Sequence, residues 1–117
     1  MDVLERELMG TLRGVWAENE CLVGLLLFGS RASGSGNEDS DVDIGLVYTG
    51  SRPVFEKPDN WDLFLWSETR WKRGFVLQVE LAKTARILYD PRGIIEERFK
   101  FIQTHILPHW VGYLRRI

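Results

Sequence analysis

The sequence has very little cysteine and no long apolar run, and both absences limit what the protein can be. Cys21 is the single cysteine in 117 residues, so the chain can form neither an internal disulfide nor a cysteine-based metal site. This favours a reducing compartment, and we expect the protein to be cytoplasmic. No stretch approaches the roughly 20 apolar residues of a membrane span, and the acidic N-terminus is not typical of a signal peptide. We therefore expect no membrane association.

An excess of positive charge is also missing. The 15 Lys and Arg residues against 17 Asp and Glu residues give a formal net charge of −2, whereas nucleic-acid binding depends on clustered basic residues that neutralise phosphates. We expect no stable nucleic-acid binding.

No repeat or linker divides the chain, so we predict one domain over residues 1–117. Such a chain is small for an enzyme that encloses two substrates, and we expect a second copy or a partner to complete its pocket.

Two neighbouring elements in the first half of the chain carry the candidate chemistry. An apolar run over 21–28 ends in Gly29-Ser30, and about ten residues later a second run begins with Asp41 and Asp43. Residues i and i+2 of a strand share a face, so these two carboxylates repel each other unless a cation lies between them. Mg²⁺ is the economical candidate, because it prefers oxygen ligands and phosphates. A Gly-Ser turn offers N–H groups and a hydroxyl to phosphate oxygens. A metal site and a phosphate site in one place together indicate nucleotide chemistry. The sequence has no P-loop motif.

The pattern Gly29-Ser30-Arg31-Ala32-x-Gly34 followed by Ser40-Asp41-x-Asp43 resembles the signature of the DNA polymerase β-like nucleotidyltransferase superfamily. In size and form the chain is most similar to the minimal nucleotidyltransferases, antitoxin-type proteins often paired with HEPN-type partner toxins. The resemblance implies that a nucleoside monophosphate, AMP from ATP, is transferred to an acceptor hydroxyl on a cognate partner protein. It also implies that Asp41 and Asp43 hold Mg²⁺, with two ions in the site. The predicted nucleotide-binding residues are Gly29, Ser30, Arg31 and Ser40, although a solvated Arg31 fits the sequence equally well.

The same resemblance calls for a third carboxylate on the following strand. Asp62 lies in the otherwise apolar run 61–66, where burial of an unpaired carboxylate is costly. We predict that it is a metal ligand and that it helps to deprotonate an incoming hydroxyl. The plain alternative is that Asp62 lies at the surface, at the start of the strand. Glu80 is the other candidate if the segment after residue 74 is a strand.

Hydrophobic periodicity predicts an α/β fold, a small mixed sheet of three to four strands with helices mainly on one face, and the resemblance implies that this fold is nucleotidyltransferase-like. Residues 67–85 fit either a helix capped by Ser67 or, from residue 75, an alternating strand. We choose the helix, because the resemblance implies a helix between two short strands. Asp90-Pro91 predicts the start of a last helix, which Pro108 breaks or kinks. The other predicted elements are a helix over 2–17 and strands over 21–28, 41–48, 61–66 and 86–89.

Two other functions fit parts of the sequence. One is a non-catalytic, antitoxin-like binding module with an idle site, against which the intact Asp41, Asp43 and Ser30 argue. The other is a small-molecule adenylyltransferase of the aminoglycoside type, which usually carries an additional helical domain. His105 and His109 lie four residues apart on the last predicted helix, but no acid or cysteine nearby completes a site, so we expect a structural or surface role for them.

Overall fold

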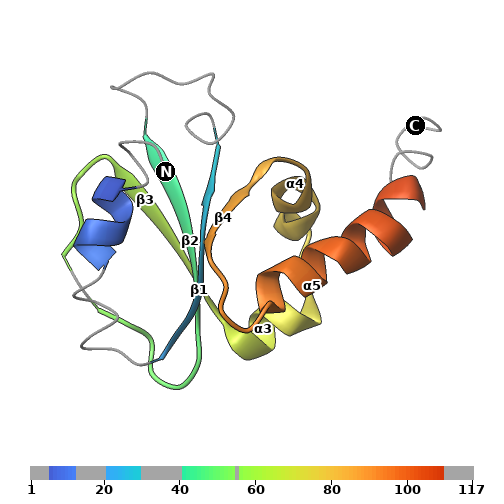
Figure 1. Ribbon diagram of the computed structural model, residues 1–117, viewed down its shortest axis with the longest axis horizontal. Helices are drawn as coiled ribbons and strands as arrows, with labels where there is room; N and C mark the ends of the chain where they lie inside the picture. Colours follow the sequence, from blue (N-terminus) through green and yellow to red (C-terminus); the bar gives the residue numbers. More distant parts are fainter. Residues whose placement is uncertain (1–5, 13–20, 30–40, 55, 110–117) are drawn as a thin grey trace.

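A computed structural model describes residues 6–12, 21–29, 41–54 and 56–109 of the chain. In that part, four strands form one mixed sheet in the order β3-β2-β1-β4, with helices on both faces (Figure 1). β1 is antiparallel to β2 and β4, whereas β2 and β3 are parallel. The small mixed α/β sheet predicted from the sequence is confirmed. The strands are β1 (Leu22–Phe28), β2 (Val42–Tyr48), β3 (Trp61–Ser67) and β4 (Arg86–Tyr89).

The first face of the sheet is covered by the helical residues 6–12. Leu8 and Leu12 lie four residues apart, on one side of that helix, and both are fully buried. They belong to the same apolar cluster as Leu25 of β1, whereas the next residue, Leu26, belongs to a second cluster on the opposite face. Because successive strand residues alternate between faces, the leucine-rich β1 supplies both cores. The described part of the predicted N-terminal helix is helical.

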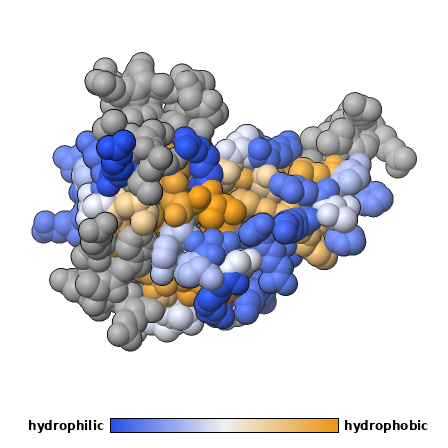
Figure 2. Space-filling model, in the orientation of Figure 1, coloured by the Kyte–Doolittle hydropathy of each residue, from blue (hydrophilic) through white to orange (hydrophobic). Residues whose placement is uncertain are grey.

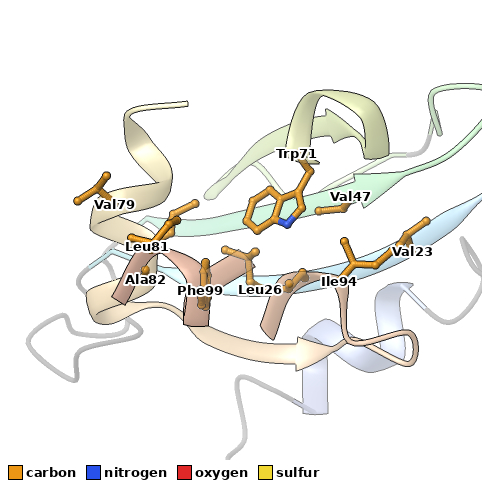
Figure 3. Packing of buried hydrophobic residues seen from close by; sticks show 11 residues of the cluster. Val23, Leu26, Val47, Trp71, Val79, Leu81, Ala82, Ile94 and Phe99 are labelled. Atoms are coloured by element: carbon orange, nitrogen blue, oxygen red, sulfur yellow. The ribbon is translucent and has the colours of Figure 1, made fainter. Parts of the chain in front are cut away.

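Three helices cover the second face of the sheet. Trp71 lies at the centre of this core without exposed surface, near Val47 of β2 and Phe99 (Figure 3). Its ring centroid is 6.0 Å from that of Phe99, a distance typical of aromatic pairs. Helices therefore lie mainly on one face, as predicted. They are α3 (Glu68–Arg73), α4 (Leu77–Thr84) and α5 (Ile94–Phe101).

The ambiguous segment 67–85 is helical, and the strand alternative is wrong. Ser67 caps α3, since its hydroxyl accepts a hydrogen bond from the N–H of Arg70 at 3.1 Å. The segment forms two helices rather than one because Gly74 has a φ of +87° and ends α3. With its ψ of 154°, this is a conformation that essentially only glycine adopts, so the chain can leave the helix here.

The predicted start of the last helix is wrong in register. α5 begins at Ile94, after Gly93, and Pro91 lies in the preceding turn instead of the first helical position. Asp90, which lies before the helix, nevertheless provides hydrogen-bond acceptors for N–H groups of its first turn. Its two carboxylate oxygens accept hydrogen bonds from the N–H groups of Ile95 at 3.2 Å and Glu96 at 2.9 Å.

The helix does not break at Pro108. After α5 it widens into the π-helical turn η1 (Ile102–Ile106), and residues 107–109 are still helical. The N–H of Leu107 donates to the carbonyl of Ile102, one residue further back than in an α-helix. Proline has no N–H, and its ring collides with the carbonyl four residues earlier in a regular α-helix, so a wider turn accommodates it.

The two edges of the sheet differ. β4 is short, and its Ile87 is 39% exposed; Figure 2 shows apolar side chains gathered over β4 and between β4 and α4. β3 forms the other edge and carries Asp62. In the part of the chain that the structure describes, no helix is both long and apolar enough to cross a membrane.

Candidate active site

The parallel pairing of β2 and β3 brings two predicted site residues together. Asp43 lies directly opposite Asp62 in the strand register, so both side chains project from the same face. The register is set at its start by the N–H of Val42, which donates to the carbonyl of Asn60 at 2.8 Å. Asp41 directly precedes β2 and, by the alternation of strand residues, belongs to the same face. The three acids predicted from the sequence therefore lie on one face at one end of the sheet.

The charges of these acids act on one another. The pKa of Asp43 is raised above its usual value of 3.8, first by burial and then by the negative charges of Asp62 and Asp41. A cation close to Asp43 would reverse this effect, because it favours the ionised carboxylate. Among the described residues, however, no three His, Cys, Asp or Glu side chains are grouped closely enough to hold a metal ion. The acids share a face and an electrostatic environment, and ligation of one ion requires their side chains to converge.

Gly29 completes this end of the sheet. It follows β1, whose Phe28 lies opposite Asp43, and its φ of +77° lies in the left-handed region. A Cβ at Gly29 would collide with Oδ2 of Asp43 and would lie 3.1 Å from its Cγ. Only glycine therefore leaves room for the Asp43 carboxylate in this position. Carboxylate oxygens in such a cradle fit a hard divalent cation such as Mg²⁺.

The third carboxylate is in the predicted strand, but the burial argument for it is wrong. Asp62 is exposed, and it lies on the edge strand β3. Its place opposite Asp43 is what brings it to the site. Glu80, the alternative, lies on α4, where it forms an exposed ion pair with Lys83 at 3.7 Å, and it is not among the charges that shift the pKa of Asp43.

Three predicted nucleotide-binding residues, Ser30, Arg31 and Ser40, lie outside the described residues. His105 and His109 are exposed, in agreement with a surface role. Trp61 and Trp71 are buried core residues, and Trp66 is partly buried.

Sequence reasoning missed a group of aromatic side chains, Phe28, Phe64 and Trp66, on the same face as the acids. The rings of Phe28 and Phe64 meet edge to face with centroids 5.1 Å apart, and Phe64 stacks on Trp66 at 6.2 Å. Phe64 is 37% exposed. It follows Asp62 by two residues on the same strand, and this spacing is the signal in the sequence that could have placed it on the face of the acids.

Comparisons with known proteins bear on the family and the fold of the chain. Residues 10–107 match the profile of the family described as "Nucleotidyltransferase domain". No protein of curated function matches the chain. A structure described as a nucleotidyltransferase from Sulfolobus solfataricus has a TM-score of 0.54 and 20% identity, covering 74% of this chain and 80% of that one.

Two toxin–antitoxin structures are also similar in fold. One, solved with AMP-PNP, has a TM-score of 0.52 and 15% identity, and 96% of each chain is covered. The other, a toxin–antitoxin MntA-HpeT carrying two Asp-to-Glu substitutions, has a TM-score of 0.53 and 14% identity over 96% of each chain.

Proposed function

The chain belongs to the nucleotidyltransferase domain family, and we propose that it transfers AMP from ATP to a hydroxyl group of a partner protein in the cytoplasm. The observation that carries this proposal is the meeting of Asp43, Asp62 and Gly29 at one end of the sheet. Acids on one face, beside a glycine turn that can face phosphates, suit a triphosphate and its metal ions. The toxin–antitoxin structures of similar fold support a partner protein, and the AMP-PNP in one of them supports ATP as the donor.

Asp41, Asp43 and Asp62 are the residues that would hold Mg²⁺. When bound, the two ions neutralise the triphosphate and the charge that develops on the attacking and leaving oxygens. The chain itself supplies position: Gly29 leaves room for the Asp43 carboxylate beside the end of β1, and the parallel register sets Asp62 opposite Asp43. Positioning and charge stabilisation are the main sources of catalysis in such transfers.

In the proposed reaction, the acceptor hydroxyl oxygen forms a bond to the α-phosphorus of ATP while the bond to pyrophosphate breaks. The hydroxyl proton passes to the carboxylate of Asp62, and pyrophosphate leaves. Gly29, Ser30, Arg31 and Ser40 are proposed to contact the phosphates. We propose a HEPN-type toxin as the protein that carries the acceptor hydroxyl, from the resemblance in sequence and the toxin–antitoxin structures of similar fold.

Calorimetric titration of ATP with and without Mg²⁺ tests the proposal. Wild-type protein should bind ATP only with Mg²⁺, and Asp41→Asn should weaken that binding by at least about tenfold, because a carboxylate ligand becomes neutral. Asp59→Asn is the matched control, since Asp59 is an exposed acid in the turn before β3. Equal binding by wild type and Asp41→Asn would contradict the metal assignment.

A further inference from the structure

Phe64 of β3 lies next to the acids, and part of its ring is open. It follows Asp62 by two residues, so the two side chains share a face of the sheet at a separation of about 6.6–6.8 Å along the strand. Phe64 is 37% exposed, a large fraction for an aromatic side chain that also contacts two other rings. A ligand held by the acids can therefore reach this ring.

The Phe64 ring leans inward, over β2 and toward β1. Its centroid is 5.1 Å from that of Phe28 on β1, although β2 lies between the two strands. The residue of β2 opposite Phe64 is Gly45, which has no side chain to keep the rings apart. Phe28 directly precedes Gly29, so the ring reaches toward the turn where the phosphates are proposed to lie.

One face of the Phe64 ring is turned toward the acids. The opposite face is stacked on Trp66, with the ring centroids 6.2 Å apart and the planes inclined by 25°. Trp66 follows Phe64 on the strand, whereas Asp62 precedes it, so these two residues lie on opposite sides of the ring. The face that Trp66 leaves free is therefore the one nearer to Asp62 and Asp43.

The proposed function, on which this inference rests, puts a nucleotide beside that free face. Asp41, Asp43 and Asp62 would hold the metal ions that bind its triphosphate, and the ribose ties its base to the same end of the sheet. Because the ring leans toward β1 and Gly29 instead of outward from β3, the group closest to it belongs to the nucleotide and not to the acceptor.

We propose that Phe64 stacks against the base of the bound nucleotide. Every base has a flat π-face, and stacking on an aromatic side chain adds affinity without contacts to the base edge. Phe28 and Trp66 hold the ring in place, so little side-chain freedom is lost on binding. The metal site then binds the phosphates, and Phe64 separately favours ligands that carry a base.

Three ligands that share a triphosphate test this contact. They are ATP, ribose 5-triphosphate, which lacks the base, and inorganic tripolyphosphate, which lacks the whole nucleoside. In calorimetric titrations with Mg²⁺, wild-type protein should bind ATP at least about fivefold more tightly than ribose 5-triphosphate, the lower end of what a base–aromatic stack contributes.

Phe64→Ala should abolish this gain and leave the binding of tripolyphosphate unchanged, because the phosphates and metal ions contact other residues. Phe64→Leu keeps an apolar side chain against Phe28 and Trp66 but has no aromatic face, so it should lose most of the gain as well. Leucine would restore the gain if Phe64 acted only through packing. Phe101→Ala is the matched control, since Phe101 is a 46% exposed aromatic residue on α5, and it should retain the full gain.

Equal binding of ATP and ribose 5-triphosphate by wild type, or a gain that persists in Phe64→Ala or Phe64→Leu, would overturn the stacking proposal. If tripolyphosphate still binds wild type only with Mg²⁺, the proposed function survives that result. If none of the three ligands binds, the proposed function fails together with the stacking contact, so the two failures can be told apart.

Discussion

At the scale of single residues, Asp43 is held in a position that disfavours its charge. Because burial, Asp62 and Asp41 raise its pKa, the native state binds this proton more tightly than the unfolded chain. Stability without metal should therefore decrease as the pH rises from 3.8 through the native pKa, and the loss should be complete above it. We predict that Asp43→Asn is more stable than wild type at neutral pH.

Urea unfolding in the presence of a chelator, from about pH 4 to pH 7, measures this effect. The difference between Asp43→Asn and wild type should grow with pH. Glu56→Gln, which changes an exposed acid outside the site, should show no comparable trend. A wild type that gains stability over the variant as the pH rises would contradict the assigned direction.

We predict that replacing Gly29 destabilises the protein for two reasons. A comparison with Gly50 separates them. Gly29→Ala adds left-handed strain, about 1–2 kcal/mol, and a collision with Asp43. Gly50 has a similar φ of +73° but nothing within 4 Å of an added Cβ, so Gly50→Ala should show the strain alone. Urea unfolding should give the larger loss for Gly29→Ala, which should also weaken ATP binding with Mg²⁺. Equal losses would mean that the carboxylate moves aside freely.

The sequence pattern identified the candidate acids, but only the structure shows how Asp62 relates to Asp43. The i, i+2 spacing of Asp41 and Asp43 indicates a shared face from the sequence alone. Asp62 was expected to be buried, and it is exposed; no local pattern reveals which strand lies at the edge of a sheet. Its partnership with Asp43 depends on a parallel register, which is a property of two distant segments.

At the scale of elements, a buried glutamine joins three helices. Gln78 of α4 has no exposed surface; it donates to the carbonyl of Trp71 in α3 at 2.8 Å and accepts from Nε of Arg98 in α5 at 2.9 Å. We predict that Gln78→Leu costs about 2–4 kcal/mol, because two poorly solvated groups lose their partner.

Urea unfolding measures this loss, and Gln103→Leu is the control. Gln103 likewise donates to a helix carbonyl, that of Ala82 at 3.0 Å, but its side chain is exposed. Water can replace that bond, so the control should lose less than about 1.5 kcal/mol. Equal losses for the two variants would argue against the importance of burial at Gln78.

The strands were easier to predict than the helix ends. Apolar runs bounded by glycine, proline or acidic residues gave all four strands within about one residue, because each is short and distinct in composition. The break at Gly74 was missed, since the helical spacing of apolar residues continues across it. The start of α5 was misplaced because Asp90 caps the helix from outside its first turn, which no cap-to-proline pattern describes.

At the scale of the whole molecule, the sheet separates two apolar cores. Leu12 belongs to the cluster beneath the N-terminal helix, and Ile95 belongs to the cluster beneath α3–α5. We predict losses of about 2–5 kcal/mol for Leu12→Ala and about 0.5–1.5 kcal/mol for Ile95→Val. Since they belong to separate clusters of the described residues, the double variant should lose the sum of the two within about 0.5 kcal/mol. A markedly larger or smaller loss in urea unfolding would show that the sheet transmits packing changes between its faces.

The wide turn before Pro108 also determines the directions in which the last helical residues point around the helix axis. A π-helical turn is equivalent to one residue inserted into an α-helix, and one residue corresponds to about 100° of rotation in a regular helix. Relative to a regular continuation of α5, residues 107–109 are therefore rotated by about a quarter of a turn. Removing one residue from 102–106 would undo this rotation, so length changes here act on orientation rather than on reach.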